Sequence, residues 1–307
     1  MTAARSSTPS PLAGQRVASR LSGEDLSLGF GRTTVVDGVS VTLRPGRVTA
    51  LVGPNGSGKS TLLRSLARLH PVTGGRIVLD SDDGADAEAR PIATLSAREF
   101  AQQVTLFAQS RVAPQGLSVR EVVAFGRHPY RRRFAGMSDD DRAAVEHALD
   151  ATGVASMADR AAGELSGGEL QRVWLAACLA QETGVVLLDE PTNHLDLRYQ
   201  VETLDLIRDL ADAHGVAVGV VLHDLDHAAR VADDLLLMAG GRVLASGTAR
   251  EVLTAENIGA AYQLRVEVSV DPRTHRLRID PVGRHAPRLH DAASVPPSTD
   301  RSREDTP

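Results

Sequence analysis

Apolar residues along this chain alternate between short continuous runs and stretches that repeat with the period of a helix. The runs "VTALV" (48–52), "GVVLLDE" (184–190) and "GVAVGVVLHD" (215–224) have the length and the β-branched content of buried strands. The stretch between 59 and 69 has helical spacing instead. Its apolar face consists of Leu62, Leu63, Leu66 and Leu69. This alternation of strands and helices predicts an α/β fold built on a mainly parallel sheet.

Other segments predict antiparallel strands beside that sheet. "EDLSLGF" (24–30) and "VSVTLRPGRV" (39–48) have the appearance of two early strands. "DLLLMAGGRVLASG" (234–247) is typical of a hairpin that turns at Gly240 and Gly241. We therefore expect an antiparallel β-subdomain in addition to the parallel core.

Between about residues 114 and 164 the pattern becomes mainly helical. Within it, "SDDDRAAVEHALDATG" begins with Ser138 and Asp141 at the spacing of a capping box. We expect a single domain over residues 21–287, interrupted by an inserted helical subdomain at about 114–164.

The composition supports one domain with an aliphatic core, since the chain has 307 residues, 42% of them hydrophobic and only 3% aromatic. The ends, 1–20 and 288–307, are rich in polar residues and proline, and we expect them to be disordered. The one cysteine, Cys178, excludes an internal disulfide and fits a reducing compartment. Because it lies in the apolar run "LAACLA", we expect an inert core residue.

Charge and hydropathy limit the possible partners. The formal net charge is -5, whereas proteins that bind nucleic acid without sequence preference usually carry the opposite balance. No apolar run approaches the ~20 residues of a membrane-spanning helix. The N-terminal segment also lacks the apolar core of a secretory signal. We expect a cytoplasmic location, with any membrane role supplied by a partner and with no nucleic-acid partner.

A phosphate-binding loop follows the first buried strand. "GPNGSGKST" matches the pattern G-x-x-x-x-G-K-[ST] and lies between a predicted strand and a predicted helix, as its mechanism requires. Lys59, the only lysine among 34 basic residues, would reach the β- and γ-phosphates, and Ser60 would supply a hydroxyl to Mg²⁺. The sequence therefore predicts binding of ATP with Mg²⁺. The residues of the loop are Gly53, Pro54, Asn55, Gly56, Ser57, Gly58, Lys59, Ser60 and Thr61.

Three further side chains are candidates for hydrolysis. "VVLLDEP" is a buried strand that ends in two carboxylates, so that Asp189 is placed to hold Mg²⁺ and Glu190 to polarise the attacking water. The next apolar strand ends near His223, at the carboxyl edge where ligands gather in such sheets. We expect His223 to contact the γ-phosphate.

A second anion site is predicted more than a hundred residues after the first. In "LSGGELQR" (165–172), Ser166 is a good N-cap and Glu169 completes a capping box, so a helix should begin there. The glycines at 167 and 168 leave backbone N–H groups uncovered at the positive end of the helix dipole. One nucleotide does not need two such sites on one chain.

These motifs together resemble the nucleotide-binding subunit of an ABC transporter. In order, the chain carries "GPNGSGKST", Gln109 in "LFAQS", "LSGGELQR", "LLDEP", "NHLD" and His223. "LSGGELQR" resembles the signature of this superfamily and departs from its common form only at Glu169. The resemblance covers about residues 24–282. It implies the ABC ATPase fold, with a P-loop NTPase core, an antiparallel β-subdomain and an inserted helical subdomain.

The resemblance also implies a second copy of the chain as partner. In this family two nucleotide-binding subunits pair head to tail, and each ATP lies between the phosphate loop of one and the signature of the other. Asp196 of "NHLD" would help to couple the two sites. The signature residues that would act across this interface are Ser166, Gly167, Gly168 and Glu169.

Two further roles come from the resemblance alone. Gln109 would lie where the helical insert joins the core, sensing Mg²⁺ and the attacking water. Phe30 occupies the place of the aromatic residue that stacks on adenine. That place is more often tyrosine, and a phenylalanine flanked by glycine could instead belong to the core.

A finer likeness is to the ATPase subunits of importers for iron–siderophores, haem and vitamin B12. It rests on "VREVVAFGRHPYR", "DEPTNHLDLRYQVETLDLIRDL" and "GRVLASGTAREVLTAENIGAAYQLRVEV". It implies ferric siderophore import as the main function, with haem or B12 as alternatives. The partners would be integral-membrane permease subunits and, indirectly, an extracytoplasmic substrate-binding protein, with this chain on the cytoplasmic face of the membrane. Because the cargo would never touch this chain, the sequence does not name it.

The segment "GRHPYRRRF" (126–134) places three consecutive arginines, 131–133, on the helical insert. In this family the insert forms much of the groove that receives a coupling helix of the permease. The arginines could serve docking or lie near anionic headgroups. They could equally form a solvated basic loop, and both interpretations stay open.

Two other functions are compatible with a single ATP cassette. The first is a soluble ABC ATPase that acts on DNA or the ribosome. The chromosomal members insert long coiled coils, and the translational members carry two cassettes, neither of which this chain contains. The second is an exporter whose membrane part is a separate chain, an alternative that the sequence leaves open, as it does the identity of the second cassette.

Overall fold

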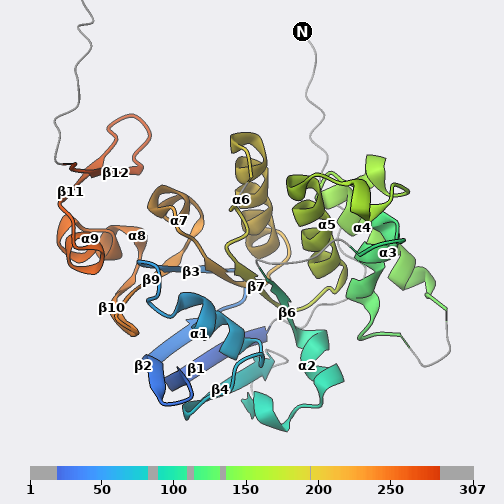
Figure 1. Cartoon of the computed structure of the whole chain (residues 1–307), viewed down its shortest axis with the longest axis horizontal. Coiled ribbons are helices and arrows are strands. Elements are labelled where there is room, and N and C mark those ends of the chain that lie inside the picture. Colours follow the sequence, from blue (N-terminus) through green and yellow to red (C-terminus); the bar gives the residue numbers. More distant parts are fainter. Residues whose placement is uncertain (1–18, 82–88, 109–113, 132–135, 194, 284–307) are drawn as a thin grey trace, which may run out of the picture.

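The computed structural model describes residues 19–81, 89–108, 114–131, 136–193 and 195–283 (Figure 1). Its centre is a six-stranded sheet in the order β10-β9-β3-β8-β7-β6. The strands from β9 to β6 in this order run parallel, and β10 is antiparallel to β9. This confirms the mainly parallel sheet. The strands are β3 (Val48–Val52), β6 (Val104–Phe107), β7 (Val185–Asp189), β8 (Ala217–Val221), β9 (Asp234–Ala239) and β10 (Arg242–Gly247).

The central strands read as continuous apolar runs because both faces of the sheet are covered. Every residue of β3, β7 and β8 is buried. Neighbouring residues point to opposite faces, so that Leu188 joins one hydrophobic cluster and Leu187 the other. One face packs against α6 (Leu197–Asp212) and α7 (Leu225–Val231), and the other against α1 (Lys59–Leu66) (Figure 1).

The predicted antiparallel part is a four-stranded sheet in the order β2-β1-β4-β5. β1 begins at Ser19, just inside the N-terminal segment expected to be disordered, and its pairing with β2 is irregular between Gly23 and Leu26. That irregularity breaks the alternation of apolar residues, so the sequence pattern showed only the second half of the strand. The strands are β1 (Ser19–Phe30), β2 (Thr33–Leu43), β4 (Gly74–Ser81) and β5 (Arg90–Pro91).

A helical layer covers one end of the parallel sheet. In it α3 (Val119–Val123) and α4 (Asp139–Ala151) pack against α5 (Gly167–Ala180), so the helical part continues past residue 164 into α5. The capping box of Ser138 and Asp141 is confirmed. The other helical elements before α5 are η1 (Ile92–Thr94), α2 (Ala97–Gln103), η2 (Ala124–Arg127), η3 (Ala155–Met157) and η4 (Ala162–Glu164).

The last elements follow the β9–β10 hairpin, whose predicted turn is confirmed by the left-handed Gly240 and Gly241, with φ of 55° and 80°. A final two-stranded hairpin contacts α7 through β12. None of the helices in the described ranges is both long and apolar enough to cross a membrane. The elements are α8 (Ala249–Val252), α9 (Ala255–Tyr262), β11 (Val266–Val270) and β12 (Leu277–Pro281).

A buried ion network ties the helical layer together. Arg127 donates from Nε to Asp141 Oδ1 at 2.8 Å and from Nη1 to Glu182 Oε2, also at 2.8 Å. Arg127 and Asp141 are each only 5% exposed. Cys178 of α5 is buried, as predicted, in the hydrophobic cluster that also contains apolar residues of α3 and α4.

Replacing Arg127 with Met should destabilise the fold, because the carboxylates of Asp141 and Glu182 would lose their cation. Breaking a buried pair costs about 3–5 kcal/mol, and urea denaturation at neutral pH should show a loss of that size. Burial alone would raise the pKa of Asp141, but hydrogen bonds from Arg127 and Ser138 lower it below its ordinary value. This stabilisation is complete above the ordinary carboxyl pKa and is lost as pH falls through the lowered one. The variant should therefore lose less stability on acidification.

Arg142→Met is the matched control. It removes an exposed pair with Asp139, whose side chain is 96% exposed, and should change stability by less than about 0.5 kcal/mol. An equal loss in the two variants would contradict the role given to the buried network.

Candidate functional site

The phosphate-binding loop connects β3 to α1 and needs glycine at defined positions. Gly53 has φ of 142°, and a Cβ there would lie 2.1 Å from the carbonyl oxygen of Met238. Gly58, with φ of 97°, would bring a Cβ to 2.6 Å from Val36. The close approach of two neighbouring strands therefore forces the loop into this shape.

Lys59, the first residue of α1, is held inside this loop. It is 5% exposed, and its Nζ donates to the carbonyl oxygens of Gly53 at 2.8 Å and Pro54 at 2.9 Å. Burial lowers the pKa of Lys59, while the carboxylates of Glu190 and Asp189 oppose that shift. The third partner of Lys59 Nζ is the Ser57 hydroxyl at 3.5 Å, so this desolvated cation is held by neutral oxygens and is well prepared to receive an anion.

Asp189, the last residue of β7, is fully buried at 0% exposure. Its Oδ1 accepts a hydrogen bond from the Ser60 hydroxyl at 2.7 Å, and Arg64 Nη2 lies 3.5 Å from its Oδ2. The fold thus brings together Ser60 and Asp189, the two oxygen donors that the sequence assigned to Mg²⁺. Hydroxyl and carboxylate oxygens are the ligand type that Mg²⁺ prefers.

Glu190 follows at the edge of the sheet and is held in a defined orientation. Its Oε1 lies 2.5 Å from His223 Nε2, and its Oε2 accepts from Asn193 Nδ2 at 2.5 Å. Its backbone has φ of 56°, in the left-handed region, and its amide donates to Val221 at the end of β8. Such strained non-glycine residues cluster at functional sites. The structure therefore joins the predicted base to the predicted γ-phosphate contact.

The predicted second anion site lies at the start of α5. Ser166 Oγ accepts from the Glu169 amide at 3.3 Å, and Glu169 Oε2 accepts from the Ser166 amide at 2.8 Å, so the predicted capping box is confirmed. Gly167 is exposed, and a Cβ there would meet nothing within 4 Å. The packing of this chain does not require a glycine at that position, which leaves the helix start open to a group from outside.

Residues 36–193 match the family model described as ABC transporter. The chain is 40% identical over 268 residues to the ferric enterobactin transport ATP-binding protein FepC of Escherichia coli (strain K12), covering 87% of this chain and 96% of FepC. This chain belongs to the ABC transporter family.

Two further matches agree with this membership. The cobalamin import ATP-binding protein BtuD of Halobacterium salinarum (strain ATCC 29341 / DSM 671 / R1) is 42% identical over 257 residues, 84% of this chain and 62% of BtuD. A metal-chelate type ABC transporter solved in an inward-facing conformation superposes with a TM-score of 0.72 at 28% identity, covering 87% of this chain and 98% of that one. The fold is thus the ABC ATPase fold, and the chain is an ATPase that binds ATP.

Three predicted site residues of this ABC ATPase remain: Phe30, Asp196 and Gln109. Phe30 ends β1 and is 61% exposed, which excludes the alternative that it belongs to the core. Asp196 is the N-cap of α6, where its Oδ1 accepts from the Tyr199 amide at 3.0 Å. Gln109 lies outside the described residues. Its assigned role stays a prediction.

Three residues that contact the site were not identified from the sequence. Asn193 holds Glu190, Arg64 lies beside Asp189, and Gln171 of α5 donates to the carbonyl of Pro191 at 2.5 Å. The i, i+4 spacing of Arg64 and Ser60 on one helix face was a usable signal. Gln171 joins the signature helix to the segment after Glu190, a contact between distant parts of the chain that no local pattern reveals.

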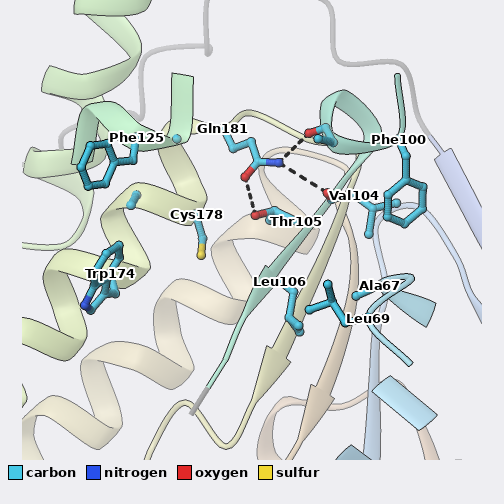
Figure 2. Close-up of a pocket in the computed structure, with 13 residues that line it drawn as sticks. Ala67, Leu69, Phe100, Val104, Thr105, Leu106, Phe125, Trp174, Cys178 and Gln181 are labelled. Atoms are coloured by element: carbon cyan, nitrogen blue, oxygen red, sulfur yellow. Dashed lines mark hydrogen bonds between the residues drawn. The ribbon is translucent and has the colours of Figure 1, made fainter. Parts of the chain in front are cut away.

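A groove of about 340 Å³ lies where the helical layer meets the core. Figure 2 shows Phe125 and Trp174 on one side and Leu69 and Leu106 toward the other. Phe125 is 49% and Leu69 68% exposed. Gln181 also lines the groove, and its Oε1 accepts from Thr105 Oγ1 of β6 at 2.8 Å (Figure 2). Exposed aromatic and aliphatic side chains in one groove are typical of a protein-binding surface.

Lys59→Ala should lower the affinity for ATP about tenfold to a hundredfold, because charge-assisted hydrogen bonds to the phosphates are lost. Isothermal titration calorimetry with ATP in Mg²⁺ buffer measures this directly. Arg198→Ala removes a cation from an exposed pair with Glu202 on α6 and is the control. An affinity that falls equally in both variants, or in neither, would count against Lys59 as the phosphate ligand.

Proposed function

We propose that this ATPase is the energy-coupling subunit of an importer for ferric siderophores. The observation that carries the ATPase part is the meeting of Lys59, Ser60, Asp189, Glu190 and His223 at one edge of the parallel sheet. The cargo is inferred from the likeness to the ferric enterobactin transport protein. This chain covers 96% of that protein's length.

Ser60 and Asp189 would hold Mg²⁺ together with the phosphates of ATP. The fit is supported by the full burial of the Asp189 carboxylate, which already accepts from Ser60 at 2.7 Å and lies beside one cation. When bound, the ion would neutralise charge that develops on the β- and γ-phosphates. Lys59 would turn its ammonium from the loop carbonyls toward the same phosphates.

Glu190 is proposed to accept the proton of the attacking water as general base. The contacts of its oxygens with Asn193 and His223, both at 2.5 Å, would fix the orientation of the carboxylate toward the attacking water. His223 would donate to the γ-phosphate once nucleotide is present, because its ring is partly exposed at that edge. Gln109 would monitor the same position from the segment that follows β6.

A second copy of the chain is the proposed partner at the nucleotide. Figure 1 places α5 in the helical layer, apart from α1, and this separation supports separate roles for the two predicted anion sites of one chain. In a head-to-tail pair, Ser166, Gly167 and Gly168 would face the γ-phosphate held by the other copy. Glu169 would fix the helix start, and Asp196 would act near the interface between the sites.

The groove between the core and the helical layer is the proposed docking site for a helix of a membrane permease. Its exposed Phe125 and Leu69 would be covered there, which removes apolar surface from water. Arg131 is exposed next to this layer, whereas Arg132 and Arg133 lie outside the described residues. This arrangement would put the chain on the cytoplasmic face of the membrane, with a substrate-binding protein on the other side.

Vitamin B12 import is the second candidate, favoured by the 42% identity to the cobalamin import protein. The siderophore assignment is preferred because the chain covers 96% of FepC but only 62% of BtuD.

Glu190→Gln should trap a dimer when saturated with Mg²⁺ and ATP, because nucleotide would close the interface and hydrolysis would no longer open it. Sedimentation velocity should show a twofold gain in mass on adding ATP. Adding Gly167→Glu in the same background should prevent it, since a carboxylate would meet the partner's phosphate. A variant that remains monomeric at saturating ATP rules out the shared-nucleotide arrangement.

Deletion of the gene tests the cargo. We expect uptake of labelled ferric siderophore to fall to background and to return with the wild-type gene but not with Glu190→Gln. Uptake of labelled haem and vitamin B12 by the same strain is measured in parallel. Loss of B12 uptake with intact siderophore uptake would reverse the order of the two candidates.

A further inference from the structure

An aromatic pair lies at the tip of the β1–β2 hairpin. Phe30 ends β1, is followed by a tight turn at left-handed Gly31, and exposes 61% of its surface. The imidazole of His70 is its ring neighbour, with centroids 4.5 Å apart and an interplanar angle of 49°. One face of Phe30 is thus supported by His70, while the exposed remainder can receive another flat ring.

His70 is itself fixed to the backbone that carries Phe30. Its Nε2 lies 3.1 Å from the carbonyl oxygen of Gly29, the residue directly before Phe30. Because a carbonyl only accepts, Nε2 carries the hydrogen of this bond. Nearby, the amide and the hydroxyl of Thr73 both donate to the carbonyl oxygen of Ser27, at 2.9 Å and 2.8 Å. The end of β1 is therefore bound to residues 70–73 by three hydrogen bonds.

The same segment leads directly back to the phosphate loop. Helix α1 starts at Lys59, and its end is closed by hydrogen bonds from Ala67 to Leu63 and from Leu69 to Arg64. His70 follows immediately. The phosphate-binding end and the aromatic ring are thus connected through one short helix and one side chain.

We propose that His70 is a positioning residue that holds the Phe30 ring as the platform for the adenine base of ATP. This inference rests on the proposed ATP binding and on the stacking of adenine on Phe30 that the sequence predicts, and it adds the residue that would hold the Phe30 ring in place. A phenylalanine at a hairpin tip would otherwise exchange between side-chain rotamers, and binding would have to order it. A ring already held by His70 loses less conformational entropy when the base arrives.

His70→Ala should raise KM for ATP about threefold to tenfold and leave kcat within about twofold, because base binding weakens while the phosphate chemistry is untouched. His70→Phe keeps a ring and should recover most of the affinity. His70→Gln keeps a donor for Gly29 without a ring and should recover less. Inhibition by inorganic tripolyphosphate, which has no base, should be the same in all three variants.

A double-mutant cycle with Phe30→Ala separates the positioning role of His70 from the stacking of adenine on Phe30. Phe30→Ala alone should raise KM at least as much as His70→Ala, and the double variant should be no worse than Phe30→Ala. His147→Ala is the control, since it removes a comparable ring contact, with His214 at 6.3 Å, on the helical layer.

The outcomes are distinguishable. If Phe30→Ala raises KM and His70→Ala does not, or if the two effects add fully, the positioning role is overturned and stacking on Phe30 stands. If Phe30→Ala leaves KM unchanged, both the stacking and the positioning role are overturned, while the ATPase assignment is unaffected. A change in tripolyphosphate inhibition with His70→Ala would show general damage to the loop and would also overturn the proposal.

Discussion

The structure depends on holding one desolvated cation, Lys59, near a fully buried carboxylate, Asp189, at the carboxyl edge of a parallel sheet. Neither charge would be tolerated there without partners. The loop carbonyls supply partners to Lys59, and the Ser60 hydroxyl and Arg64 supply them to Asp189. Each of these contacts can be exchanged for a phosphate oxygen or a metal ion. Charge compensation is therefore what makes the site ready for ATP.

The contacts around the site link it to three other parts of the molecule. Gln171 connects the signature helix α5 to the segment after Glu190. Gln181, at the other end of α5, bonds to Thr105 of β6 beneath the exposed groove. His70 connects the aromatic ring at the hairpin tip to the end of α1. These three contacts involve both ends of α5 and the segment that follows α1.

The helical layer is stabilised differently from the sheet. The sheet is buried on both faces by two hydrophobic clusters, whereas the helical layer also relies on the ion network of Arg127, Asp141 and Glu182. Such a network is directional, since it requires a fixed geometry among three elements. It keeps α5 aligned with α4 while leaving the groove above Trp174 open.

The sequence by itself determined the elements and the chemistry that depend on local pattern. Periodicity identified the buried strands, and the spacing around Lys59 and Ser166 predicted two anion sites, because backbone N–H groups at a helix start are local features. The proximity of Ser60 and Asp189 was also expected, since the sequence assigned both residues to Mg²⁺. Contacts between separate segments were decided only by the tertiary structure: Gln171 with Pro191, and His70 with Phe30. These contacts depend on how separate elements pack, and no periodicity or motif specifies which side chains of two distant segments will be in contact.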